Sequence, residues 1–176
     1  MKTRRFWITS AAAGLAGVAG VAAWYTKDAA SPQLEALPEP FWALRFEKPQ
    51  GGELALGELR GQPLLVNFWA TWCPPCLQEL PDLQRFQQAY RSKGWRVVGI
   101  AIDSPSAVRQ FLQRMPLDFD IGMGGLQGAE LTRSLGNSAG SLPFTVIINR
   151  AGQISQRKLG VTHFEEITAW AAMPGH

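Results

Sequence analysis

Two cysteines separated by two prolines, Cys73 and Cys76, constrain this chain more than any other feature of its sequence. A near-continuous apolar run over 63–69 precedes them, and a run with apolar residues every three or four positions follows them. The first pattern predicts a strand buried on both faces, and the second predicts an amphipathic helix. The pair therefore lies at a strand-to-helix junction, where unpaired backbone N–H groups and the helix dipole stabilise a thiolate.

The order of the two cysteines predicts a different role for each. Cys73 stands at the start of the helix, so we expect it to have a lowered pKa and to be the attacking sulfur. Cys76 comes one turn later and deeper in the fold, where it can resolve a mixed disulfide by attacking Cys73. Pro74 and Pro75 suit the first helical turn, in which no amide partner is lost. The sequence has no third cysteine, which excludes a further structural bridge and a four-sulfur zinc site.

Residues 1–30 are typical of a signal peptide or an N-terminal membrane anchor. The head MKTRR is positive, and 6–25 carries no charge. Aromatic residues near both ends of this apolar run favour a retained anchor, whereas the small residues at 21–23 form an acceptable cleavage site. The arginine pair at 4–5 fits twin-arginine export as well as the general secretory route. In either case the rest of the chain is exported, which in a diderm bacterium means the periplasm.

The rest of the chain is close to neutral. Residues 31–40 contain three prolines and predict a linker to one domain over 41–176. The formal net charge is +3, and the first five residues supply this excess. From residue 29 onward, 13 basic side chains face 13 acidic ones, so no basic stripe supports a nucleic-acid partner. A hydrophobic content of 46% predicts a buried core.

The pattern of the domain alternates strands with helices and ends in a hairpin and a helix. We expect strands over 41–46, 53–56, 63–69, 96–102, 116–122, 144–149 and 153–159. We expect helices over 73–92, 105–115 with Ser104 as N-cap, 127–135 and 163–173. This order predicts an α/β fold, in which helices flank a central mixed sheet with a parallel middle and an antiparallel edge.

Three segments carry a family resemblance: VNFWATWCPPC at 66–76, the helix proline Pro81, and SLPFTVIINRAGQI at 141–154. With them, the chain from about residue 41 to its end resembles the thioredoxin superfamily, most closely the TlpA/ResA-like branch of periplasmic thiol–disulfide oxidoreductases. The resemblance implies a thioredoxin-like fold with an N-terminal strand extension. It also implies a helix–strand insertion before a cis-proline.

The resemblance assigns roles to individual residues. Pro143 matches the family's cis-proline, which faces the disulfide, and the backbone of Leu142 would pair with a substrate strand. Glu79 matches an acid beneath the cysteines that tunes or shuttles their protons; the alternative is an ordinary exposed helix residue. Asn67 departs from thioredoxin, which carries a buried aspartate at this position, so Glu79 is the one candidate for the acid. The predicted substrate contacts are Trp72, Pro74, Pro75 and Leu142.

The implied activity is exchange of the CPPC disulfide or dithiol with cysteines of exported proteins. The resemblance favours a reductase supplied by a DsbD/CcdA-like membrane thiol electron donor. We expect a monomer with no cofactor, because two thiols carry the chemistry. Cytochrome c maturation is one such role, but cytochrome c-specific members carry an acid directly after the cis-proline, where this chain has Phe144. The residues alone leave the direction of exchange open.

Three alternatives come from other classes. A copper-binding assembly factor of the Sco kind would add a distant histidine such as His163, although those proteins space their cysteines by three residues. A thiol peroxidase would use Thr71, two residues before Cys73, although the CPPC pair and Trp72 belong to disulfide exchange. A binding module without catalysis would not need a thiol at a helix N-terminus.

Overall fold

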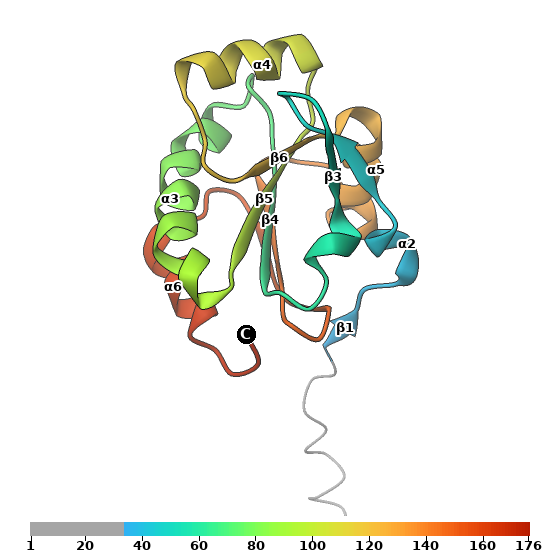
Figure 1. Ribbon diagram of the computed structural model, residues 1–176, viewed down its shortest axis with the longest axis vertical. Coiled ribbons are helices and arrows are strands. Elements are labelled where there is room, and N and C mark those ends of the chain that lie inside the picture. The colour runs from blue at the N-terminus through green and yellow to red at the C-terminus, as the bar shows by residue number, and fades with distance from the viewer. Residues whose placement is uncertain (1–33) are drawn as a thin grey trace, which may run out of the picture. The chain divides into compact units, whose positions relative to one another are not determined.

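A six-stranded mixed sheet organises residues 34–176, the part of the chain that the computed structural model describes (Figure 1). In the order β1-β8-β7-β4-β5-β6, its strands are β1 (Glu35–Ala36), β8 (Gln153–Leu159), β7 (Phe144–Ile148), β4 (Leu64–Trp69), β5 (Arg96–Ala101) and β6 (Asp120–Met123). A separate hairpin consists of β2 (Arg45–Glu47) and β3 (Glu53–Ala55). The helices are α2 (Glu39–Trp42), α3 (Pro74–Tyr90), α4 (Pro105–Arg114), α5 (Gly125–Ser134) and α6 (Phe164–Ala171), with short 3₁₀ turns η1 (Leu56–Leu59) and η2 (Arg91–Lys93).

Strand β4 lies in the middle of the sheet and leads to the cysteines. It runs parallel to β5 and antiparallel to β7, and all six of its residues are buried. This burial confirms the expectation of a strand covered on both faces. The parallel middle continues from β5 to β6, and the antiparallel edge continues from β7 through β8 to β1.

Two apolar cores cover the two faces of the sheet. On one face, α3, α4 and α6 pack around a core that includes both cysteines, Leu80, Phe111 and Ile167. On the other face, α2, α5 and the β2–β3 hairpin pack through Phe41, Leu131 and their neighbours. Figure 1 shows α3 and α6 on one side of the sheet and α2 and α5 on the other. The predicted fold class is confirmed, and the segment between β5 and Pro143 contains α4, β6 and α5.

The expected strand over 41–46 is wrong in its first half. Residues 39–42 form helix α2, and the strand covers only Arg45–Glu47. Pro38 caps this helix and a second proline lies in its first turn, where the missing N–H costs no hydrogen bond. Phe41 and Trp42 are both buried against the second core, which a short helix allows for neighbouring residues and a half-buried strand does not.

The expected linker over 31–40 also needs correction for the residues described. Glu35 and Ala36 form β1, which pairs with Ile154 and Gln153 of β8. The backbone N–H of Leu37 donates to the Gly152 carbonyl at 2.9 Å, and its side chain is buried. The folded unit therefore begins at Leu34.

The expected signal peptide or anchor over 1–30 lies outside the described residues. Among the helices of residues 34–176, none combines the length and the apolar character needed to cross a membrane.

Candidate active site

The two cysteines form a disulfide where β4 ends and α3 begins, with an S–S distance of 2.09 Å. Cys73 is the N-cap of α3, and its Sγ accepts a hydrogen bond from the Cys76 backbone N–H at 3.3 Å. Cys73 keeps 4% of its surface exposed, whereas Cys76 keeps none. An incoming sulfur can therefore approach Cys73 more readily than Cys76, as the predicted division of roles requires.

Residues 70–73, here called the redox loop, connect β4 to α3. The loop turns through a hydrogen bond from the Cys73 N–H to the Ala70 carbonyl at 3.3 Å. Trp72 is 66% exposed although it is the largest side chain of the loop. Pro74 and Pro75 occupy the first two positions of α3, the first exposed and the second half-buried. Trp72, Pro74 and Pro75, three of the predicted substrate contacts, are thus neighbours of the cysteines in sequence. Each of them is at least partly exposed to solvent.

The Leu142–Pro143 peptide bond is cis, as the resemblance predicts. Pro143 directly precedes β7, whose first residue, Phe144, pairs with Phe68 near the end of β4. Pro143 therefore lies at the same edge of the sheet as the redox loop. Leu142 contacts the core that contains both cysteines, which brings the cis bond and the disulfide to one site.

The backbone of Leu142 has the properties expected of a docking strand. Within residues 34–176, neither its N–H nor its carbonyl takes part in a hydrogen bond. Its neighbours on both sides are held: the Ser141 carbonyl accepts from the Asn137 amide at 2.8 Å, and the Pro143 carbonyl accepts from the Gly160 N–H at 2.9 Å. Pairing with a substrate strand remains a prediction, and the backbone groups it needs are unused.

Glu79 is fully buried, so it is not the exposed helix residue of the alternative interpretation. Its Oε1 accepts from the Asn67 side-chain amide at 2.6 Å, and its Oε2 accepts from the Thr162 backbone N–H at 2.7 Å. Thr145 joins the same cluster, because its hydroxyl accepts from the Asn67 amide at 3.0 Å and from the Thr162 hydroxyl at 3.2 Å. These four residues form a buried polar network that links α3, β4, β7 and the loop after β8.

Burial raises the pKa of Glu79 from its ordinary value of 4.5 to about 7. Desolvation is the largest cause, because it disfavours the charged carboxylate. The hydrogen bonds from Thr162 and Asn67 favour the charged form and offset part of this effect. A carboxyl group that titrates near neutral pH can take up and release protons under working conditions.

His163 and Thr71, on which two of the alternative functions depend, both contact aspartate side chains. His163 is exposed, and its Nδ1 lies 3.7 Å from Oδ2 of Asp82. Residues 34–176 contain no group of three His, Cys, Asp or Glu side chains arranged to hold a metal ion. The hydroxyl of Thr71 donates to Asp103 at 2.6 Å, so its hydrogen is not directed to the Cys73 sulfur. Trp69 is buried and packs against Phe111, as a core residue does.

Reasoning from the sequence missed three polar residues at this edge of the sheet. Asp103 could have been found, because it directly follows a buried strand and the carboxyl ends of parallel strands meet at one edge. Thr145 is the one polar residue of the buried strand β7, and a single threonine in an apolar run gives no signal of its own. Thr162 lies in a loop, and its backbone N–H contacts a residue 83 positions earlier.

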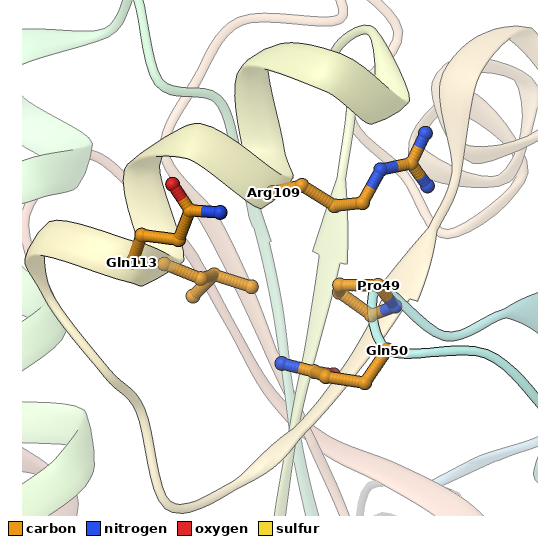
Figure 2. A pocket seen from close by; sticks show the side chains of 5 residues that line it. Pro49, Gln50, Arg109 and Gln113 are labelled. Carbon is orange, nitrogen blue, oxygen red and sulfur yellow. The ribbon is translucent and has the colours of Figure 1, made fainter.

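A cavity of about 200 Å³ lies elsewhere, between α4 and the β2–β3 turn. Arg109, Leu112 and Gln113 of α4 line it together with Pro49 and Gln50 (Figure 2). None of the predicted site residues lines this cavity. The disulfide, in contrast, lies at the edge of the sheet where β4 ends and β7 begins, next to the exposed side chain of Trp72.

A disulfide across a Cys-Pro-Pro-Cys turn at a helix N-terminus, on this fold and at the same sheet edge as a cis-proline, defines a thiol–disulfide oxidoreductase of thioredoxin-like structure. A family model described as Redoxin matches residues 36–170, and the chain belongs to this family. Among similar proteins, a thiol-disulfide oxidoreductase ResA of Halalkalibacterium halodurans is 29% identical over 154 residues, which cover 87% of this chain and 85% of that protein. The sporulation thiol-disulfide oxidoreductase A of Bacillus subtilis is 26% identical over 156 residues, covering 86% and 90%.

Solved structures agree with this assignment. StoA from Bacillus subtilis superposes with a TM-score of 0.61 at 25% identity, covering 73% of this chain and 95% of StoA. A thioredoxin-family thiol:disulfide interchange protein from Chlorobium tepidum TLS gives a TM-score of 0.70 at 22% identity, covering 80% and 95%. The second likeness supports the fold alone.

Proposed function

We propose that this chain is an exported reductase of protein disulfides. The observation that carries the proposal is the asymmetry of the Cys73–Cys76 pair, in which Cys73 caps a helix N-terminus and keeps a small exposed area, whereas Cys76 is fully buried. The names of the similar proteins support thiol–disulfide exchange. Export is supported by the charge and apolar pattern of the first 30 residues.

The reaction has two steps. In the first, the Cys73 thiolate attacks one sulfur of a substrate disulfide; that S–S bond breaks, a mixed disulfide forms, and the other substrate cysteine leaves as a thiolate and takes up a proton. In the second, Cys76 loses its proton and attacks the Cys73 sulfur. The mixed disulfide breaks, the Cys73–Cys76 bond forms, and the second substrate sulfur leaves as a thiolate and takes up a proton. The substrate has then gained two electrons and two protons; Cys76 released one proton and the solvent supplied the other.

Glu79 is the proposed acceptor of the Cys76 proton. Both residues are fully buried on α3 and lie three positions apart, on the same side of the helix. Because burial raises the Glu79 pKa to about 7, this carboxyl group is partly ionised at neutral pH and can accept a proton from a thiol. Water reaches neither residue, so a proton on Cys76 needs an internal acceptor of this kind.

Turnover requires a reductant, and a membrane dithiol donor of the DsbD/CcdA-like kind is the proposed source. Its thiolates would reduce the Cys73–Cys76 disulfide by the same two steps in reverse. Substrates are exported proteins with a disulfide that fits beside Trp72 and the free backbone of Leu142. Cytochrome c maturation is a weaker candidate role, because Phe144, which directly follows the cis-proline, is buried and stacks on Phe68 instead of offering an acid.

The reduction potential of the Cys73–Cys76 pair tests the direction of exchange. Tryptophan fluorescence of the full-length chain, equilibrated in thiol buffers, reports the redox state because Trp72 adjoins the disulfide. A value near about −270 mV supports a reductase, whereas a value near about −120 mV would make the chain a disulfide-forming oxidant. Failure to reduce any model protein disulfide, with the pair itself fully reducible, would reject exchange as the activity.

A further inference from the structure

Asp103 connects the redox loop to the loop that follows β5. Its Oδ2 accepts two hydrogen bonds from Thr71, one from the backbone N–H at 2.9 Å and one from the hydroxyl at 2.6 Å. Its Oδ1 accepts from the Ser104 backbone N–H at 2.7 Å. Both oxygens of one carboxylate are thus used, and two of the three donors belong to the residue immediately before Trp72.

The topology of the sheet explains this contact. β4 and β5 are parallel neighbours, with Trp69 beside Ala101 at their ends. The pairing continues one residue further, because the Ile102 N–H donates to the Trp69 carbonyl at 2.8 Å. Asp103 therefore emerges beside Thr71, and Ser104 then caps α4 by accepting from the Ala107 N–H at 3.3 Å. Asp103 thus connects the redox loop to the N-terminus of α4.

We propose that Asp103 is a positioning residue, which acts through Thr71 to hold Trp72 and Cys73 in the geometry that a substrate disulfide requires. This inference rests on the proposed exchange function. Between residues of the loop itself, the Cys73 N–H donates to the Ala70 carbonyl at 3.3 Å, and the Cys73 carbonyl accepts from the Leu77 N–H of α3 at 3.2 Å. Hydrogen bonds to a carboxylate are about twice as strong as neutral ones, so the Asp103 contacts are a strong anchor for Thr71, the residue directly before the exposed Trp72.

Thr71→Val is the sharpest test, because it keeps the shape of the side chain and the Asp103 charge and removes only the hydroxyl donor. Thr71→Ser restores that donor. Asp103→Ala removes all three contacts together with the charge. Asp118→Ala is the matched control, since Asp118 is a surface acid whose one hydrogen bond comes from the Gln88 side chain at 2.6 Å, outside the site.

The measurements use the full-length chain in its reduced form. The first is the rate constant with which Cys73 attacks a peptide disulfide, and the second is the hydrogen-exchange protection of the Thr71 amide. We expect Thr71→Val to slow the attack by about tenfold, the factor that corresponds to one charged hydrogen bond of ~1.4 kcal/mol. Thr71→Ser should recover most of the rate, and Asp103→Ala should also remove the amide protection.

The outcomes separate this inference from the proposed function. A wild-type rate in Thr71→Val and Asp103→Ala, with exchange intact, overturns the positioning role and leaves the function standing. Loss of rate without rescue by Thr71→Ser also overturns it, because general damage to the fold then explains the loss. A wild-type chain that attacks no disulfide, while Asp103→Ala still loses Thr71 amide protection, rejects the function and leaves the anchoring intact.

Discussion

The Asn67 side-chain amide donates to the Glu79 carboxylate at 2.6 Å, within the fully buried layer between β4 and α3. Thioredoxin-like chains can place an acid on the strand; here the strand supplies the hydrogen-bond donor and the helix supplies the acid. Within residues 34–176, the partners that favour the charged form of Glu79 are the neutral donors Asn67 and Thr162 and the more distant Lys158. The pH behaviour of the fold and of the site should both depend on this pair.

Glu79 should make the stability of the chain fall as pH rises. Its pKa is about 7 when folded and 4.5 as an ordinary value, so between these two pH values the folded state binds more protons than the unfolded state. The contribution is fully present below pH 4.5 and lost above about 7, with a total size of about 3 kcal/mol. Urea unfolding of the oxidised chain across this range should show the decline, and Glu79→Gln should remove it. An equal decline in Glu79→Gln assigns the effect to other groups.

Asn67→Asp should push the titration of this site to higher pH. Two carboxyl groups within hydrogen-bond reach cannot both ionise at low cost, so one pKa of the pair rises beyond that of Glu79 alone. The free energy of unfolding should then keep falling above pH 7. Asn149→Asp is a matched control, because Asn149 is also buried but contacts only the chain around Gln153. Identical pH profiles for the two variants would contradict the coupling.

The two cysteine variants should differ in what they accumulate. Cys73→Ser should lose exchange activity, whereas Cys76→Ser should trap a mixed disulfide with the substrate, because no second thiol remains to resolve it. Non-reducing electrophoresis and mass spectrometry of the adduct identify the trapped sulfur. If Cys73→Ser forms the adduct and Cys76→Ser does not, the assigned roles are reversed.

Trp72→Ala should affect substrates in proportion to their size. The side chain is 66% exposed, so its removal should change the free energy of unfolding by less than about 0.5 kcal/mol. Reduction of a folded protein disulfide should slow by about tenfold, a typical effect of losing an aromatic anchor at an interface, while a small-molecule disulfide reacts at the wild-type rate. Leu126→Ala is the control, as an apolar residue that is 86% exposed on α5. Equal slowing for both substrates would place Trp72 in the chemistry instead of in docking.

The parts of the fold that are predictable from sequence are those in which one pattern dominates. The apolar run before Cys73 and the helical repeat after it locate β4 and α3 within a few residues, and β8 matches over Gln153–Leu159. Helix α2 was not predicted, because four residues are too short to show a period and its two aromatic residues also fit a strand. At the site, the cysteines follow from a local motif, and the cis-proline follows from the family resemblance. The Asp103–Thr71 and Glu79–Thr162 contacts depend on strand order and loop paths, which no local pattern encodes.

Strand β1 determines at which end of the sheet the described chain begins. Its partners Ile154 and Gln153 lie at one end of β8, and Leu159, which pairs with Phe144 beside the cis-proline, lies at the other. Five residues of strand separate these ends by about 17 Å. Any membrane attachment through the preceding residues would therefore connect to the sheet at the end opposite the disulfide. The chain thus enters the described fold at the end of the sheet remote from the redox loop.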